Sequence, residues 1–371
     1  MRILRVAQKV YPEFTGGGAY HVHALCRDQS EMGHDVTLLT VSKDASADRR
    51  EERDGYTVVR RPPTVEVLGN TVSAGVARFL RTTDRFDVVH AHSHLYASTN
   101  LAAVARRFGD TPLIITNHGL YSQSAPERLF GGYLRTLGRW TLDTADVVLC
   151  YTDEDERRLR DLGVSARVEV VANGVDGDRF TPEGPRSGRI DTDGPVVLFV
   201  GRLVEGKRPG DALEAVAELR ASVPGVSLYF CGDGPLAGTL RGQAVEHGIE
   251  DSVTFLGHVP HGEMPRVYRS ADVLVLPSRA EGFPRTVIEA LASGVPVVTS
   301  DLDQLEATVE RAGETVPVGE VRRLVEALYD LLADERRRRE LGQRGRALVE
   351  REFQWETTVR ETTRLSRELL G

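Results

Sequence analysis

The sequence predicts an α/β protein with two doubly wound parallel sheets in tandem. Short apolar runs alternate with amphipathic stretches through the first half of the chain, and the same alternation restarts after residue 195. Strands that alternate with helical stretches are typical of βαβ units. Residues 181–195 are rich in proline, glycine and charge, which indicates an interdomain linker. The length of 371 residues suits two domains of about 100–200 residues each.

The apolar runs assign the elements of both halves. In the first half we expect strands at 2–7, 36–41, 56–60, 87–91, 112–116, 146–151 and 168–172. We expect helices there at 18–32, 72–82, 96–107 and 127–142. In the second half the expected strands are 195–200, 226–231, 252–256, 272–276 and 295–299. The expected helices are 209–222, 235–247, 263–269, 284–293, 319–333, 335–352 and a last one over 354–369. Ligands of such sheets bind at the carboxyl ends of the strands, and two facing sheets would form a cleft.

Composition and charge describe an ordinary globular protein. Hydrophobic residues make up 40% and charged residues 27% of the chain, and the net charge of −8 does not favour a nucleic-acid partner. Cys26, Cys150 and Cys231 lie in separate apolar stretches, so we expect buried free thiols in a reducing compartment. The sequence contains neither a signal peptide nor about 18 consecutive apolar residues, so we expect a cytoplasmic protein.

A glycine cluster precedes the first expected helix. Gly16, Gly17 and Gly18 let the backbone approach a phosphate closely, and a helix N-terminus favours anions. The dinucleotide fingerprint G-x-G-x-x-G is absent, however. A plain flexible loop is the alternative.

Four histidines lie at expected strand ends of the first half. His90, His92 and His94 alternate along one extended segment, so all three could point to one side. No carboxylate or cysteine accompanies them, and we therefore favour a strand end entering a polar cleft over a metal site. His118 follows the strand PLIIT, where it could serve a ligand or the structure alone. The dipeptide Asn173-Gly174 marks a tight turn, which we interpret as a hinge.

Two cations follow the first strand of the second half. Arg202 and Lys207 lie five residues apart in a loop that leads to a helix, and two cations at a strand end suit a diphosphate. Lys207 is one of only three lysines in the chain. A solvent-exposed pair is the alternative.

Glycine turns follow the next two strands. Gly232 and Gly234 in YFCGDGPL permit close backbone approach to a ligand, and FLGHVP repeats the design with His258 and Val259. Either turn could also simply connect a strand to a helix without binding a ligand.

The segment PSRAEGFPRTVIEALASGVPVVTSD is the most informative. Glu281 lies in a loop at a strand end, Phe283 and Pro284 lead into a helix, and Glu289 falls inside that helix. The free N–H groups of the loop can receive a phosphate or sugar oxygen. Glu289 could bind ribose hydroxyls, because a carboxylate accepts two hydrogen bonds at once. Its neighbours are apolar, so its burial would need partners.

Together these segments resemble the retaining glycosyltransferase family 4, which has the GT-B fold. The resemblance covers nearly the whole chain and rests on GGGAYHVHAL, VANGVDGDRF, GRLVEGK, CGDGPL, FLGHV and EGFPRTVIE in this order. It implies two Rossmann-like domains facing across a cleft, an acceptor-side domain over 1–183 and a nucleotide-sugar-binding domain over 192–353. It also implies that the last helix, 354–371, packs back on the first domain.

The resemblance assigns roles to the donor-binding residues. It implies that Arg202 and Lys207 bind the donor diphosphate and that Glu289 holds the ribose. Glu281 and the backbone of residues 282–284, from Gly282 onward, match the loop that contacts sugar hydroxyls and phosphate.

Three further groups belong to the implied site. The motifs CGDGPL and FLGHV add Gly232, His258 and Val259 to the nucleotide-sugar site. His118 matches the histidine near the transferred sugar. Gly16 and Gly17 match the loop that closes over the phosphates.

The implied reaction transfers a hexose from a UDP- or GDP-linked donor with retention of configuration. Departure of the diphosphate develops charge, which preorganised cations and N–H groups stabilise. We therefore expect no metal and no cofactor, the nucleotide-sugar being a co-substrate. In the family a front-face route is favoured. We expect His118, Glu281, Arg202 and Lys207 to take part in the reaction.

The sequence departs from the family pattern at two places. Glu205-Gly206-Lys207 stands where Glu-Lys-Gly is usual, and the glycine-rich turn after Asp301 is absent. Donor contacts over 302–320 are therefore left unassigned.

Other functions and several acceptors stay open. A nucleotide-sugar epimerase, a sugar phosphorylase and a non-catalytic nucleotide-sugar binder are the alternatives. A phosphorylase would need a pyridoxal-phosphate lysine, and Lys207 is the only lysine beyond residue 43. A glycan, a lipid-linked intermediate and a small metabolite are all candidate acceptors.

Residues 127–141 allow a peripheral membrane contact at the inner face of the membrane. Leu129, Phe130, Tyr133, Leu134, Leu137 and Trp140 are spaced as on one helix, with three arginines among them. A basic amphipathic helix can rest on an anionic leaflet. The alternative is a core helix with snorkelling arginines.

Overall fold

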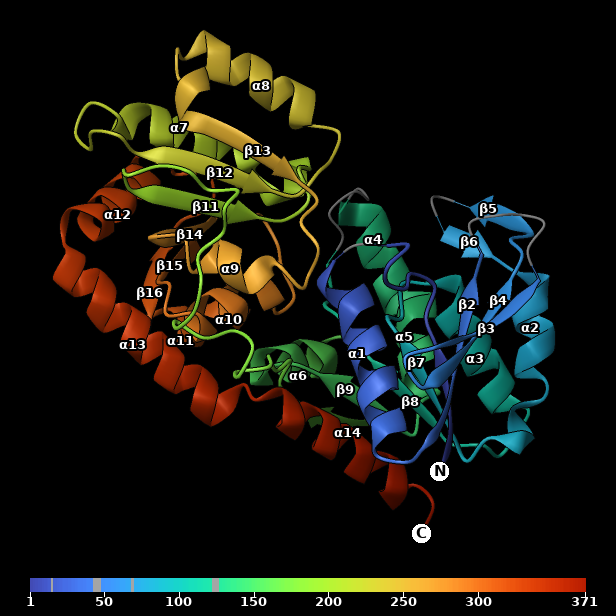
Figure 1. Ribbon diagram of the computed structural model, residues 1–371. Coiled ribbons are helices and arrows are strands. Elements are labelled where there is room, and N and C mark those ends of the chain that lie inside the picture. The colour runs from blue at the N-terminus through green and yellow to red at the C-terminus, as the bar shows by residue number, and fades with distance from the viewer. Residues whose placement is uncertain (15, 43–47, 68–69, 122–126) are drawn as a thin grey trace. The chain divides into compact units, whose positions relative to one another are not determined.

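The computed structural model describes residues 1–14, 16–42, 48–67, 70–121 and 127–371 (Figure 1). Its contacts divide the chain into two units, the first formed by Met1–Ala172 with Thr357–Gly371 and the second by Asn173–Glu356. Each unit contains its own largely parallel sheet, which confirms the predicted α/β class. The second unit begins earlier than the expected linker, because Val175 pairs with Gln354 and Arg285 donates a hydrogen bond to the Gly174 carbonyl.

The first unit is built on an eight-stranded sheet. Its order is β10-β9-β8-β7-β1-β2-β4-β3, and every pair is parallel except β3 with β4. The strands are β1 (Arg2–Val6), β2 (Asp35–Val41), β3 (Arg49–Arg53), β4 (Tyr56–Arg61), β7 (Val88–His92), β8 (Leu113–Thr116), β9 (Val147–Cys150) and β10 (Arg167–Val170). A small hairpin joins β5 (Val65–Val67) to β6 (Asn70–Val72). The strand order reverses between β1 and β7, and such reversals mark ligand sites in open α/β sheets.

Seven helices accompany this sheet in the described part of the chain. They are α1 (Gly17–Glu31), α2 (Ala74–Leu80), α3 (Ala97–Arg107), α4 (Glu127–Tyr133), α5 (Arg139–Asp143), α6 (Asp153–Asp161) and most of α14 (Trp355–Glu368). A single π-helical turn over Leu134–Gly138 joins α4 to α5, so the helix expected over 127–142 is interrupted by one wide turn.

The C-terminal helix α14 lies in the first unit. Gln29 of α1 donates a hydrogen bond from Nε2 to Thr363 Oγ1 at 2.9 Å, and Thr358 Oγ1 donates to the Ala172 carbonyl at 2.7 Å. The last residues of the chain thus complete the unit that the first residues begin.

The second unit contains a six-stranded parallel sheet. Its order is β13-β12-β11-β14-β15-β16. The strands are β11 (Val196–Val200), β12 (Ser227–Cys231), β13 (Val253–Gly257), β14 (Val273–Leu276), β15 (Val297–Ser300) and β16 (Gly313–Val316). The helices are α7 (Pro209–Leu219), α8 (Ala237–Glu246), α9 (Met264–Tyr268), α10 (Arg285–Ala292), α11 (Asp303–Val309), α12 (Val321–Ala333) and α13 (Glu335–Glu352). Here the strand order reverses between β11 and β14.

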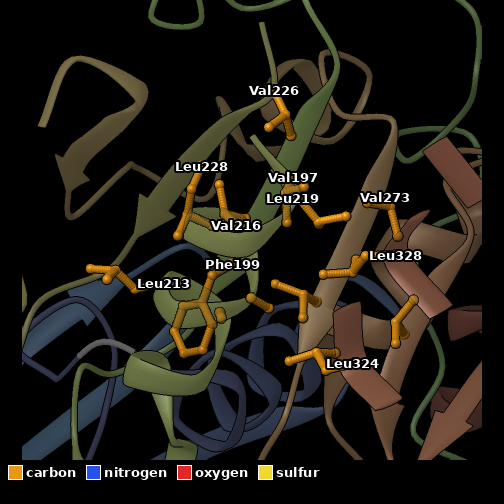
Figure 2. Packing of buried hydrophobic residues seen from close by; sticks show 14 of the residues in the cluster. Val197, Phe199, Leu213, Val216, Leu219, Val226, Leu228, Val273, Leu324 and Leu328 are labelled. Carbon is orange, nitrogen blue, oxygen red and sulfur yellow. The ribbon is translucent and has the colours of Figure 1, made fainter. Parts of the chain in front are cut away.

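The core of the second unit forms between the sheet and helices α7 and α12. Figure 2 shows Val197 and Phe199 of β11 packed among Leu213, Val216 and Leu219 of α7 and Leu324 and Leu328 of α12. Leu198 and Leu274 alternate with the core-facing strand residues and are also fully buried, so the sheet is covered on both faces. Burial of each large aliphatic side chain stabilises the fold by about 1.5–3 kcal/mol.

The stretch expected as a linker belongs to the second unit. Residues 181–195 contain neither helix nor strand. The Ser187 N–H donates to Ser270 Oγ at 2.8 Å, and Arg269 donates to the Pro185 carbonyl at 3.0 Å. The segment is therefore held to the end of α9.

Candidate functional site

The loops after β11 and β14 bring a lysine and a glutamate together in the second unit. Lys207 Nζ forms an ion pair with Glu281 Oε1, and the side chains are 13% and 3% exposed. The Arg279 N–H donates to the Gly206 carbonyl at 2.9 Å and joins the two loops. Arg202 lies on the first of these loops and is exposed. The sequence predicted all three charged residues as candidates, and the structure pairs Lys207 with Glu281.

A helix that the sequence did not predict also contacts this site. Gln304 of α11 donates a hydrogen bond from Nε2 to the Glu281 backbone carbonyl. Helix α11 lies inside the stretch 302–320, where the sequence departs from the family pattern. A glutamine in a segment that departs from the family pattern carries no sequence signal of its own.

The loop from Gly282 to Pro284 leads into α10. Gly282 and Phe283 are buried, and the Phe283 ring stacks on Phe353 with the ring centroids 5.2 Å apart. Pro284 precedes the first helical residue, and no side chain caps the helix. In the first turn of α10 the Val287 N–H donates to the Pro284 carbonyl at 3.1 Å, and a helix N-terminus of this kind favours an anion.

Glu289 is buried inside α10 with three polar partners. Its Oε2 accepts a hydrogen bond from Tyr268 Oη at 3.0 Å, and its Oε1 lies 3.3 Å from His261 Nε2 and 3.5 Å from Arg285 Nε. Burial alone would raise the pKa of this carboxyl, but His261, Arg285 and Tyr268 outweigh burial and hold it below its usual value. The partners that burial requires are thus present. A ribose hydroxyl would have to compete with them.

The residues after β13 divide differently from the prediction. His258 is exposed and Val259 is buried, whereas His261, which the sequence did not single out, contacts Glu289. Burial lowers the pKa of His261, so its ring is neutral at neutral pH and its Nε2–H can donate to the carboxylate.

The glycines after β12 have a structural explanation. Gly232 has φ 142°, and a Cβ there would lie 2.0 Å from the Gly201 carbonyl oxygen. A Cβ on Gly234 would lie 2.4 Å from the Leu203 carbonyl oxygen. Both glycines therefore allow the chain to approach another part of the backbone closely. That backbone belongs to the loop that carries Arg202, whereas the sequence predicted close approach to a ligand.

In the first unit, the glycine cluster opens α1 beside a histidine. Gly16 precedes the helix with φ 138°, no side chain caps it, and its first turn holds no acidic residue. Gly16, Gly17 and Gly18 are exposed. A Cβ on Gly18 would lie 3.5 Å from His118 Nδ1, so this turn passes directly over the imidazole.

His118 lies in a cluster of rings at the carboxyl ends of β7, β8 and β9. Its Nδ1 is 2.8 Å from Tyr151 Oη, and its Nε2 is 3.3 Å from His92 Nδ1. The rings of His90 and His92 stack with centroids 4.5 Å apart. Burial lowers the pKa of His118 to about 4, so the ring is neutral at neutral pH.

His94 does not join this cluster. Strand β7 ends at His92, and Ser93 has φ 64°, which turns the chain away before His94. The His94 ring stacks on Tyr133 instead, with centroids 6.4 Å apart. The expected alternation therefore holds for His90 and His92 only. No three His, Cys, Asp or Glu side chains of the described residues are grouped to hold a metal ion.

The segment 127–141 leaves apolar side chains on the surface. Leu129, Leu137 and Trp140 are 71%, 45% and 40% exposed, whereas Leu134 is buried. Trp140 also lines a surface depression of about 660 Å³ with Arg106, Arg107 and Phe108. Within the described ranges, no helix combines the length and the apolar character that crossing a bilayer demands.

Two family models match the chain in succession. Glycosyltransferase Family 4 matches residues 15–179, and Glycosyl transferases group 1 matches residues 181–348. A GDP-mannose-dependent alpha-(1-6)-phosphatidylinositol monomannoside mannosyltransferase of Mycolicibacterium smegmatis is 32% identical and covers 84% of each chain. The glycogen synthase of Mycobacterium tuberculosis is 29% identical over 98% of this chain and 94% of its own.

Solved structures share the fold of the whole chain. Sucrose-phosphate synthase from Thermosynechococcus elongatus has a TM-score of 0.84 at 23% identity, over 100% of this chain and 99% of its own. Anabaena HepE in complex with UDP-glucose has a TM-score of 0.83 at 21% identity, over 99% and 100%. At these identities the likeness is one of fold.

We expect the stability of the first unit to fall between pH 7 and pH 5. His94 is fully buried with its pKa lowered to about 4, mainly by burial, whereas an unfolded histidine titrates near 6.5. The unfolded state therefore binds more protons than the folded state in this interval. The free energy of unfolding falls as the pH is lowered from 7 to 5, by about 2 kcal/mol for this residue.

Urea unfolding at both pH values measures the effect. In a Trp355→Phe background, the fluorescence of Trp140 reports on the first unit, because the chain has only two tryptophans. His94→Phe should reduce the difference between the two pH values. An unchanged difference in that variant would contradict the assignment.

Proposed function

Because the chain belongs to glycosyltransferase family 4 and has the GT-B fold, we propose that it is a retaining, metal-independent hexosyltransferase. Its donor would be a UDP- or GDP-linked hexose. The observation that carries the proposal is the ion pair between Lys207 and Glu281 at the carboxyl ends of β11 and β14, with Arg202 on the same loop as Lys207. These ends flank the reversal of strand order, where ligands of such sheets bind.

In this proposal the two cations bind the donor diphosphate. Arg202 is exposed and its planar guanidinium suits a diphosphate, and Lys207 adds a compact charge on the same loop. Charge on the leaving diphosphate is stabilised most when such donors are already in position. The ion pair with Glu281 holds Lys207 in position before the donor binds, so neither side chain needs to be ordered on binding.

Glu281 and Glu289 have different roles in this proposal. Glu281 would accept hydrogen bonds from hydroxyls of the transferred sugar while it remains paired with Lys207. Glu289 would receive the ribose hydroxyls in exchange for its weaker contacts with His261 and Arg285, at 3.3 and 3.5 Å. The two carboxylates are therefore not assigned as the acid and nucleophile of a glycosidase pair.

Two relatives support the choice of donors. The Mycolicibacterium smegmatis relative is named as GDP-mannose-dependent, and the Anabaena neighbour was solved with UDP-glucose. We propose one of these two nucleotide classes for this chain. The chemistry at Lys207 and Glu281 serves either base.

We expect UDP or GDP, but not both equally, to raise the melting temperature of the purified protein. A ligand at 100 times its dissociation constant adds about 2.7 kcal/mol of stability. The double variant Lys207→Met/Glu281→Gln should lose this shift, because it removes the cation without leaving a buried carboxylate unpaired. Arg344→Ala, which removes one exposed cation from α13, is the matched control. A full shift in the double variant would sink the proposed diphosphate site.

We expect hydrolysis of an α-linked donor to release the α-hexose first. With water as acceptor, proton NMR of the released sugar before mutarotation reports the configuration directly. The rate should be unaffected by EDTA, because the proposed stabilisation of the diphosphate comes from Arg202, Lys207 and backbone N–H groups. Initial release of the β-hexose would overturn retention, and loss of activity with EDTA would overturn metal independence.

We also propose a cytoplasmic protein that rests on an anionic membrane through 127–141 and acts on a lipid-linked acceptor. Leu129, Leu137 and Trp140 are exposed among Arg128, Arg135 and Arg139, which suits an interfacial helix. The name of the Mycolicibacterium smegmatis relative includes a phosphatidylinositol monomannoside, which favours a lipid-linked acceptor over a soluble one.

We expect the fluorescence of Trp140 to shift to the blue when anionic vesicles are added to the Trp355→Phe variant. Binding should weaken at high salt, since screening reduces attraction between the arginines and the lipid headgroups. Leu137→Glu should weaken binding at least tenfold, whereas Val245→Glu on exposed α8 should not. Equal binding to neutral and anionic vesicles, or no effect of Leu137→Glu, would refute the contact.

A further inference from the structure

A buried arginine lies in the sheet of the first unit with only neutral partners. Arg5 is on β1, next to β7 at the reversal of strand order, and its side chain is fully buried. Its Nη1 is 3.1 Å from His90 Nδ1 and 2.9 Å from His92 Nε2, and its Nη2 donates to Gln29 Oε1 at 2.7 Å. Burial lowers its pKa to about 10, so the guanidinium stays protonated at neutral pH. A buried charge needs hydrogen-bond partners, and these contacts at Nη1 and Nη2 supply them, whereas the buried Nε has none among the described residues.

The guanidinium dictates which histidine nitrogens carry hydrogen. It has donors only, and the two hydrogens of Nη1 point to one nitrogen on each of two rings. His90 Nδ1 and His92 Nε2 must therefore be acceptors. A neutral imidazole carries its hydrogen on the other nitrogen. His90 accordingly donates from Nε2 to Thr116 Oγ1, at 2.7 Å.

The same logic continues from His92 to His118. The hydrogen of His92 lies on Nδ1, which faces His118 Nε2 at 3.3 Å, so His118 accepts there. The hydrogen of neutral His118 then lies on Nδ1, which faces Tyr151 Oη at 2.8 Å. If these hydrogen bonds ran in the opposite direction, a His92 N–H would face an Arg5 N–H. Arg5 therefore sets one direction for all these hydrogen bonds.

We propose that Arg5 is a positioning residue that, acting through His92, fixes His118 in its Nδ1–H tautomer. His118 then offers a hydrogen-bond donor at Nδ1, beside the glycine turn of α1, and does not serve as a base there. On the function proposed above, a ligand oxygen that displaces Tyr151 would receive this hydrogen. The proton that the acceptor substrate loses in the transfer would therefore go to a group other than His118.

The groups around His92 and His118 agree with neutral rings. Burial first, and then Arg5 and the neighbouring histidines, lower the pKa of His90 and His92. Among the described residues, the titratable and charged side chains in contact with the two rings are His21, His90, Tyr151 and Arg5. None of these is a carboxylate that would favour an imidazolium.

The wild-type protein tests the proposal without a substrate. Two-bond nitrogen–proton spectra of protein labelled with 15N-histidine distinguish the two neutral tautomers and the imidazolium of each ring. His118→Asn and His92→Asn identify the two signals by their loss. We expect His118 with hydrogen on Nδ1 and His92 with hydrogen on Nδ1, both unchanged between pH 8 and pH 5.5. His118 with hydrogen on Nε2 would overturn the proposal, whatever the variants show.

Variants at Arg5 test the cause. In Arg5→Met, no guanidinium N–H faces His92 Nε2, so either nitrogen of His92 can carry the hydrogen. The His118 signal should then become a mixture of tautomers. Arg5→Lys should restore the Nδ1–H form, because an ammonium group can also donate to both rings. Arg2→Met, the loss of an exposed cation on the same strand, is the matched control and should leave the spectrum unchanged. A folded Arg5→Met with the wild-type spectrum would refute the role of Arg5.

The outcome separates this inference from the proposed function, on which only the role of His118 toward a ligand rests. If the predicted tautomer is found, Arg5→Met disturbs it and no nucleotide binds, the donor proposal fails and the role of Arg5 stands. If nucleotide binds and the tautomer is the other one, the reverse holds. If Arg5→Met does not fold, the wild-type spectrum decides the tautomer and Arg5→Lys tests the cause: a mixture of His118 tautomers in that variant would refute the role of Arg5.

Discussion

The ion pair between Lys207 and Glu281 is the interaction on which the strand ends of the second unit depend. It joins the loop after β11 to the loop after β14 where the strand order reverses, and both side chains are largely removed from water. Neither charge is stable there alone, because a buried ion without a partner loses its hydration and gains nothing in return. A cation and a carboxylate are thus held in fixed positions at these strand ends before any ligand arrives.

The first unit also places a buried cation at its reversal of strand order, but pairs it with neutral groups. Arg5 has two histidines and a glutamine as partners, and no carboxylate of the described chain pairs with it. An opposite charge, as at Lys207, holds the cation in place while it can still attract an anionic ligand. The neutral histidines at Arg5 instead accept its hydrogen bonds and donate from their other ring nitrogen. The resulting series of hydrogen bonds ends at His118 and Tyr151.

Most of the fold could be predicted because most strands are apolar where they meet the core. All strands of the second sheet except β16 were expected within a few residues, and β16 has a single buried residue among its four. Strand β3 was missed because RREER contains no apolar residue, and it lies at the antiparallel edge of the first sheet. The strands of the β5–β6 hairpin have three residues each, too few to show a period.

The sequence by itself determined the two-domain α/β class, the family and the loops that carry Arg202, Lys207, Glu281 and His118, because these depend on local pattern and on residue type. Only the tertiary structure decided which side chains meet. Gln304 reaches Glu281, and Arg5 reaches His92, across strands and helices far apart in the chain. Neither contact has a periodicity or a spacing to reveal it. Whether a buried polar group is a ligand, a partner or a positioning residue depends on its neighbours in space, and parallel β-sheets choose those neighbours by strand order.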